Sequence, residues 1–403
     1  MPSEPIKDPR NPWLKKLVLG HRIVAALVFN TLLLFVAGNL VLWVAYSLHD
    51  WRQPTNLLLA RPEQFLSAAY PGWSVEERTV LLQEAWRRVL AYEDYLMFRE
   101  APMRGKYINV SEAGFRLSQN QGPWPPKAEN FNVFVFGGST MFGSALPDEQ
   151  TVPSRLQAVL TADSPRRVCV YNFGTSFFYS TQERLLLERL LSQGFTPNVA
   201  LFVDGLNDFI QADDTPAYRQ RFKDAFEQAH QKRRLFAAAA EQLPAARLAQ
   251  SIRERMRKPK PAELATETAR AARVIAVYRN NKAIIEPLCR AKGVAPVFVW
   301  QPIPWYNYDL KSFLWYGTTQ KPRLIHAVGY AQMREVFEPG VLGTNFLWCA
   351  DLQQDEKALL YVDVHHYTAA FSQKLAETIC AMSLQRGLFK ISAAQTSEPP
   401  AGR

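Results

Sequence analysis

The stretch NVFVFGGSTMFG, residues 132–143, decides how the chain is interpreted, because an apolar run ends abruptly in two glycines, a serine and a threonine. Two glycines after a strand can mark only a tight turn. They also allow a turn sharp enough to place a serine hydroxyl at the carboxyl edge of a parallel sheet, where open α/β sheets bind ligands. The rest of the chain must distinguish a turn from a nucleophile.

Apolar, β-branched runs alternate with amphipathic runs through the C-terminal two thirds of the chain. The expected strands are 133–136, 168–172, 199–203, 294–301 and 345–349, and the expected helices include 152–160, 182–192, 271–292 and 368–384. Such alternation predicts an α/β fold in which helices cover both faces of a parallel sheet.

The N-terminal region contains a long uncharged segment, Ile23–Ser47. About twenty apolar residues are enough to cross a bilayer, and a signal peptide has a shorter apolar core of roughly 7–15 residues. Five basic residues precede the segment and only two follow it closely. The positive-inside rule therefore predicts an uncleaved single-pass anchor with the C-terminal domain outside the cytoplasm, in the periplasm of a Gram-negative cell.

The predicted organisation has five parts. They are a cytoplasmic tail at 1–22, a transmembrane anchor at 23–48, a juxtamembrane helical segment and linker at 49–127, an α/β domain at 128–388 and a flexible tail at 389–403. Ser74 and Glu77 have the spacing of a capping box and predict a helix in the juxtamembrane segment.

A basic helical insertion is expected at about 209–262. Residues 216–260 hold twelve Lys or Arg against four Asp or Glu, which is most of the net charge of +10. A solvated helix face, a lid that attracts anionic substrate, and a surface for anionic lipid headgroups all fit this surplus. No zinc-finger, aromatic RNA-binding or helix-turn-helix signature accompanies it, so nucleic acid is not expected as a partner.

The four cysteines show no CxxC spacing, so no metal site is expected. The sequence leaves open whether Cys349 and Cys380 pair or remain thiols.

Polar residues follow the predicted strands where an ordinary core would not need them. They are Ser139; Asn172 and Gly174; Gly205, Asn207 and Asp208; and, before the last helix, Asp363, His365 and His366. Acyl transfer requires a nucleophile, a base, a carboxylate that orients the base, and donors for the developing oxyanion. The chain contains a candidate for each role.

These blocks resemble those of the SGNH hydrolases, also called the GDSL esterase/lipase family. The resemblance covers residues 131–388 and implies a flavodoxin-like three-layer sandwich. FGGST supplies Ser139 as nucleophile and backbone oxyanion donor, YNFG supplies Gly174 and DGLND supplies Asn207 as the other donors. DVHH supplies Asp363 and His366 as orienting carboxylate and base.

Two positions depart from the family pattern. Gly138 stands where the family signature has aspartate, and Phe177 stands at the second glycine of the second block. The implied function is hydrolysis of an acyl ester without a metal or organic cofactor. O-acyl transfer to a cell-envelope polysaccharide and a catalytically silent glycan-binding scaffold are the alternatives. The acyl chain, the acceptor and the oligomeric state stay open.

Overall fold

The computed structural model describes residues 12–52, 61–162, 164–219, 243–256, 264–309, 324–338 and 340–391. The chain divides into two compact units, one built from 56–219 and 261–403, the other from 1–55 and 220–260. Much of the predicted basic insertion and most of the predicted C-terminal tail lie outside the described residues.

The larger unit is built on a five-stranded sheet in which all neighbouring strands run parallel. The strand order is β6-β5-β7-β8-β9. The strands are β5 (Phe131–Gly137), β6 (Val168–Asn172), β7 (Val199–Asp204), β8 (Ala295–Trp300) and β9 (Phe346–Trp348). The predicted parallel α/β fold is confirmed.

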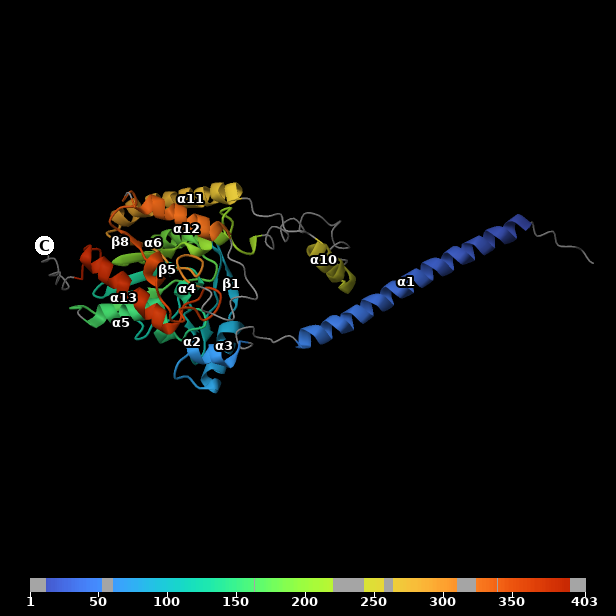
Figure 1. Ribbon diagram of the computed structural model, residues 1–403, viewed down its shortest axis with the longest axis horizontal. Helices are drawn as coiled ribbons and strands as arrows, with labels where there is room; N and C mark the ends of the chain where they lie inside the picture. Colours follow the sequence, from blue (N-terminus) through green and yellow to red (C-terminus); the bar gives the residue numbers. More distant parts are fainter. Residues whose placement is uncertain are drawn as a thin grey trace, which may run out of the picture. The chain divides into compact units, whose positions relative to one another are not determined.

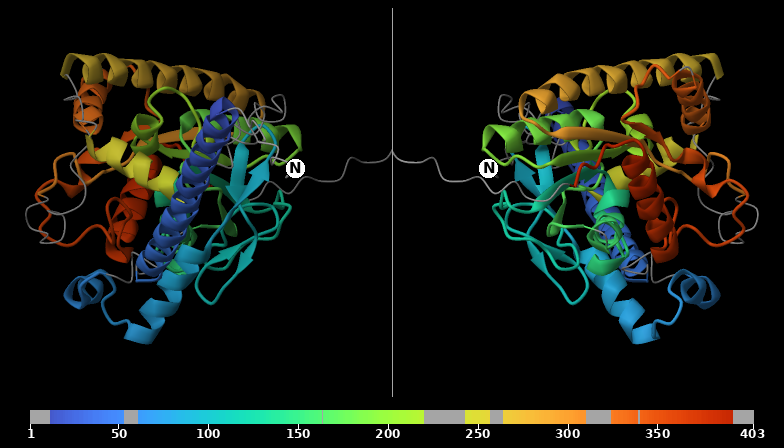
Figure 2. Two further views of the ribbon diagram at one scale, coloured as in Figure 1. Left: turned by 90° about the vertical axis from the view of Figure 1, so that its right-hand side faces the viewer. Right: turned by 90° about the vertical axis from the view of Figure 1, so that its left-hand side faces the viewer.

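Helices cover both faces of this sheet, giving three layers (Figure 1). One face carries α5 (Val152–Ala162) and α13 (Ala369–Gln385), which lie side by side (Figure 2). The other face carries α6 (Ser180–Ser192), α11 (Leu264–Ala291) and α12 (Leu324–Phe337).

The two faces of the sheet differ in the kind of apolar side chain that they bury. Because successive strand residues point to opposite faces, each strand sorts its residues between the two layers. Aliphatic residues of β5, β7 and β8 pack toward α5 and α13, and aromatic residues pack toward α6 and α11. Phe136, Phe202 and Phe298 are paired in register and stack at centroid distances of 4.9 and 5.3 Å.

The N-terminal segment, residues 61–104, belongs to the same compact unit as the sheet. It contains α2 (Glu63–Ala69), α3 (Val75–Arg87), the hairpin of β1 (Leu90–Glu93) with β2 (Met97–Glu100), and β3 (Met103–Arg104), which pairs with β4 (Asn109–Val110). The predicted capping box is confirmed, since the Glu77 N–H donates to Ser74 Oγ at 3.2 Å and the Ser74 N–H donates to Glu77 Oε2 at 2.9 Å.

The smaller unit consists of α1 (Pro12–Arg52) and α10 (Pro244–Met256). Residues 19–48 of α1, in which an 18-residue window has a mean hydropathy of 2.2, are long and apolar enough to cross a membrane. The Ala245 N–H of α10 donates to Asn39 Oδ1 of α1 at 3.0 Å, and the Arg247 guanidinium lies 4.2 Å from the ring centroid of Tyr46.

Candidate active site

Gly137, the last residue of β5, and Gly138 allow the chain to enter the short helix α4 (Ser139–Phe142) close to the side chain of Asn207. A Cβ on Gly138 would lie 2.2 Å from Asn207 Nδ2, so only glycine lets that amide come so close. The turn of the opening stretch therefore places Ser139 next to Asn207 at the carboxyl end of the sheet. This position is where an open α/β sheet binds ligands.

A fully buried arginine fixes the far end of α4. Arg116 Nη1 donates to the carbonyl oxygens of Phe142 and Gly143, both at 2.7 Å, and its Nε donates to Asp148 at 2.8 Å. Burial lowers the pKa of Arg116, and the Asp148 carboxylate opposes that effect. These bonds satisfy carbonyl groups that a short helix leaves open and hold Ser139 in place.

The structure brings Ser139, His366 and Asp363 together although His366 lies 227 residues from Ser139. His366 Nε2 is 2.8 Å from Ser139 Oγ, and His366 Nδ1 is 2.6 Å from Asp363 Oδ2. The other oxygen of Asp363 accepts the N–H groups of His365 at 3.0 Å and His366 at 2.9 Å. This is the hydrogen-bonded chain that nucleophilic acyl transfer requires.

The environment keeps Asp363 ionised. Burial by itself raises the pKa of Asp363, but the charge and hydrogen bond of His366, with help from His365, lower it well below its usual value. The carboxylate can therefore orient His366 and stabilise its protonated form.

Asn207 lies on α7 (Leu206–Ile210), directly after β7. Its Nδ2 donates to the Phe178 carbonyl at 2.7 Å, which orients the amide and leaves its second hydrogen for another acceptor. Asp208 Oδ2 accepts the Gly205 N–H at 3.0 Å, so Asp208 caps the N-terminus of α7.

Gly174 occupies a different position from the one that the sequence predicts. Its N–H donates to Asn172 Oδ1 at 2.9 Å, and a Cβ on it would lie 2.3 Å from the backbone nitrogen of Phe142. Gly174 is buried against α4 and is not among the residues that line the cavity around Ser139. This arrangement contradicts the prediction that Gly174 donates to an oxyanion.

Phe177 lies where Gly174 was expected, beside Ser139 and Asn207 in the cavity wall. Its φ is +67°, a left-handed conformation that glycine adopts easily and phenylalanine rarely does. Within the described residues its N–H has no acceptor. Strain of this kind clusters at functional sites. The sequence feature that could have identified Phe177 is its place in the second block, where the family pattern has a second glycine.

The cavity around Ser139 has a volume of about 710 Å³. Aromatic side chains that sequence analysis did not single out form much of its wall: Trp86, Tyr218 and Trp305, together with Phe177. His365 and His326 also line it, and His326 Nε2 lies 3.2 Å from the Leu206 carbonyl. Sequence periodicity cannot find such residues, because they come from segments far apart in the chain.

The N-terminal segment closes one side of this cavity. Arg88 Nη1 donates to Glu100 at 3.2 Å, and its Nη2 donates to Ser144 Oγ at 3.0 Å. Glu100 in turn accepts the Ser176 N–H at 2.9 Å and the Ser176 hydroxyl at 2.6 Å. The loop that carries Phe177 is thereby attached to the β1–β2 hairpin.

Three buried carboxyl groups lie behind Asn207: Glu183, Asp204 and Asp208. Burial, followed by the neighbouring carboxylates, raises the pKa of both Glu183 and Asp204, and burial raises the pKa of Asp208. A side-chain hydrogen bond between Glu183 and Asp204 adds to these effects: it raises the pKa of Glu183 and lowers that of Asp204.

No group of three or more His, Cys, Asp or Glu suited to a metal ion occurs among the residues that the structure describes. The four cysteines are buried free thiols, including Cys349 and Cys380.

Comparisons with known proteins find no matching family model and no matching curated protein. Solved structures do match. A protein described as lipolytic and of the G-D-S-L family, from Desulfitobacterium hafniense, is 11% identical, with 63% of this chain and 99% of that chain covered and a TM-score of 0.34. The acetylxylan esterase Axe2 from Geobacillus stearothermophilus is 14% identical, with 62% and 93% covered and a TM-score of 0.33. The lipase Lip_vut3 from a goat rumen metagenome is 12% identical, with 65% and 100% covered and a TM-score of 0.39. The function proposed below rests on the geometry of the site.

Proposed function

We propose that the protein is a membrane-anchored serine esterase that hydrolyses an acyl ester. The observation that carries the proposal is the chain of hydrogen bonds from Ser139 Oγ through His366 to Asp363, at 2.8 and 2.6 Å. His366 removes the hydroxyl proton as Ser139 attacks the ester carbonyl, and then donates that proton to the leaving alcohol. Water, activated by His366, then attacks the acyl-enzyme and releases the acid.

The proposed oxyanion hole consists of the N–H groups of Ser139 and Phe177 and the side-chain amide of Asn207. The engagement of Gly174 N–H by Asn172, and the unused N–H of Phe177 in the cavity wall, support this set. A complex with an alkyl phosphonate bound to Ser139 tests it. We expect the phosphonyl oxygen about 2.7–3.1 Å from Phe177 N. An oxygen that instead lies at Gly174 N would reject Phe177 as a donor.

Acyl transfer to a cell-envelope polysaccharide is the second candidate. The 710 Å³ cavity has exposed aromatic side chains at Trp86, Phe177 and Tyr218, and such surfaces can stack on sugar rings as well as on acyl groups. The products distinguish the two reactions: hydrolysis releases free acid from a simple ester, and transfer leaves the acyl group on an added glycan.

The membrane part of the proposal rests on α1. Its uncharged segment Ile23–Ser47 supports an anchor, and the basic flank supports a cytoplasmic N-terminus. The contact of α10 with Asn39 and Tyr46 supports a place for α10 at the non-cytoplasmic surface of the bilayer. There its apolar Leu248 and Ile252 would contact lipid, while Arg247 and Arg253 would meet anionic headgroups.

Variants at the reacting groups test the proposed chemistry. Ser139→Ala and His366→Ala should each abolish turnover of small acyl esters and labelling by a fluorophosphonate probe. His365→Ala should retain both, since the imidazole within hydrogen-bonding distance of Ser139 Oγ belongs to His366. Full activity in Ser139→Ala, with an unchanged melting temperature, would reject Ser139 as the nucleophile. Absence of turnover and of labelling in the wild type would favour the scaffold interpretation.

A further inference from the structure

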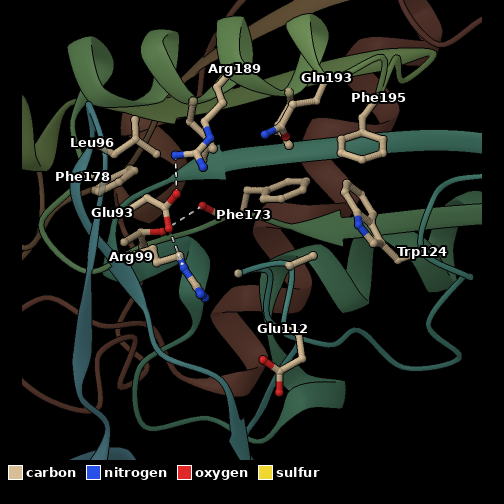
Figure 3. Close-up of a pocket in the computed structure, with 15 residues that line it drawn as sticks. Glu93, Leu96, Arg99, Glu112, Trp124, Phe173, Phe178, Arg189, Gln193 and Phe195 are labelled. Carbon is tan, nitrogen blue, oxygen red and sulfur yellow. Dashed lines mark hydrogen bonds and ion pairs between the residues drawn. The ribbon is translucent and has the colours of Figure 1, made fainter.

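The structure has a second cavity of about 310 Å³, whose lining residues are shown in Figure 3. It is separate from the cavity around Ser139, called the catalytic cavity below after its proposed role. Its wall comes from the β1–β2 hairpin, the Phe173–Phe178 loop, α6 and the linker around Trp124. No residue proposed above for catalysis lines it.

One part of this cavity is apolar and aromatic. Trp124 and Phe195 lie with ring centroids 4.6 Å apart, and Phe173 is 5.9 Å from Trp124. Leu186 and Leu190 of α6 extend this surface. The area is suited to an aryl ring or a short alkyl chain.

The opposite part carries two guanidinium groups around one carboxylate (Figure 3). Glu93 accepts from Arg99 Nε at 2.7 Å and also pairs with Arg189. Both arginines pair with Glu93, whereas Glu112 lies on another part of the rim (Figure 3). The three paired groups therefore keep one net positive charge.

Hydrogen-bond donors also exceed acceptors at this rim. Each guanidinium has five N–H donors. Apart from Glu93, the acceptors are one backbone carbonyl for Arg99, at 3.3 Å, and one for Arg189, at 3.2 Å. Among the described residues no further acceptor of either side chain occurs, so several N–H groups remain for a ligand. A carboxylate matches the planar fork of a guanidinium and its charge.

We propose that this cavity is a binding site for a small amphipathic carboxylate. Its apolar part would lie on Trp124, Phe173 and Phe195, and its carboxylate would accept hydrogen bonds from Arg99 and Arg189. The proposal does not depend on the proposed esterase activity, because it rests on a cavity that contains none of the reacting groups.

The site shares two walls with the catalytic cavity. In the hairpin, Leu90 and Glu100 line the catalytic cavity, and Glu93 and Arg99 line the second. In the loop, Ser176 and Phe177 line the first, and Phe173 and Phe178 line the second. Binding measurements must therefore distinguish the two cavities.

Titration of the full-length protein in nanodiscs with 4-fluorophenylacetate, followed by ¹⁹F NMR, tests the proposal. The neutral isostere 4-fluorophenylacetamide is the matched probe. We expect the acetate to bind at least 10-fold more tightly. Arg189→Gln should weaken its binding by roughly 10- to 100-fold, the usual effect of losing one charge-assisted hydrogen bond. Arg189→Lys should retain part of the affinity, and Phe195→Ala should weaken both probes.

Two control variants assign the site. Trp86→Ala alters only the catalytic cavity and Arg290→Gln removes a surface arginine elsewhere, so both should bind the acetate as the wild type does. Equal affinities for acetate and acetamide would overturn the proposal. So would wild-type binding by a folded Arg189→Gln variant, or loss of binding in Trp86→Ala. If Arg189→Gln does not fold, Arg189→Lys and Phe195→Ala decide the outcome.

Discussion

Alanine at Gly138 would test whether the glycine turn exists to bring Asn207 to Ser139. The added Cβ would lie 2.2 Å from Asn207 Nδ2, so the amide must retreat by about 1.2 Å to reach an ordinary contact of about 3.4 Å. Misplacement of a reacting group by about 1 Å can cost roughly 10²-fold, and loss of an oxyanion donor costs about 10²–10³ in kcat. We expect Gly138→Ala to lower kcat about 100-fold, or about 2.7 kcal/mol of barrier, in a steady-state assay with a small acyl ester.

Gly137→Ala is the matched control. A Cβ at position 137 would lie 2.4 Å from Met141 Cγ, which belongs to a flexible side chain outside the reacting groups. The melting temperature of this variant should therefore fall, while its kcat stays close to that of the wild type. A double-mutant cycle makes the reasoning refutable. Gly138→Ala should add little loss of kcat in an Asn207→Ala background, because both changes remove the same donor. If the losses of kcat from Gly138→Ala and Asn207→Ala were fully additive, Gly138 would not act through the position of Asn207.

Three further predictions concern backbone strain, pH and lipid. Phe177→Gly should retain kcat, because the backbone N–H remains, while KM changes because the ring is lost from the cavity wall. The free energy of unfolding from chemical denaturation should change little, because relief of the strained φ of +67° offsets the entropy cost of ordering a glycine. Burial raises the pKa of Glu183, so the folded state gains stability at low pH and loses it as the pH rises through that pKa; the melting temperature of Glu183→Gln should exceed that of the wild type at pH 8, with a smaller difference toward pH 4. A polarity-sensitive dye on Ile252→Cys should report an apolar setting in nanodiscs with anionic lipid, and Arg247→Glu with Arg253→Glu should abolish that signal; a signal that depends on neither charge nor salt would contradict the lipid-facing helix.

The sheet could be predicted from the sequence because its signal is local. Each strand is a short apolar run, and the sorting of aromatic from aliphatic residues in β5 and β8 reflects the alternation of side chains along a strand. The strand predicted at 345–349 corresponds to β9, which has only three residues. Short edge elements leave little pattern to read.

The candidate site could be predicted only in part. Ser139 lies in the short motif FGGST, and Asp363 and His366 lie in the short motif DVHH, so each can be recognised locally in the sequence. The structure brings the three residues together. For Gly174 and Phe177 the sequence offers only the missing second glycine of the YNFG block. Their roles depend on which N–H donates to Asn172 and which residue has a left-handed backbone. These are properties of packing and not of local pattern.

The second wall of the catalytic cavity was invisible for another reason. Trp86, Arg88 and Glu100 precede Ser139 by 39 or more residues, and nothing in their own neighbourhood indicates a cavity. Their role depends on the ion pair of Arg88 with Glu100 and on the bonds of Glu100 to Ser176. Only the folded arrangement of the N-terminal segment reveals it.

Because the N-terminal segment is both a cavity wall and the continuation of the proposed anchor, it would limit where the proposed esterase can work. Ten residues separate Arg52, the end of α1, from Glu63, the start of α2. Fully extended, ten residues reach at most about 36 Å. With α1 as the proposed anchor, this length would confine the start of α2 to a shallow layer next to the membrane. Tethering would keep the effective concentration of the enzyme in that layer high. Lengthening this tether with a Gly/Ser linker would deepen the layer, and turnover of esters held farther from the bilayer would rise as that of membrane-proximal esters falls.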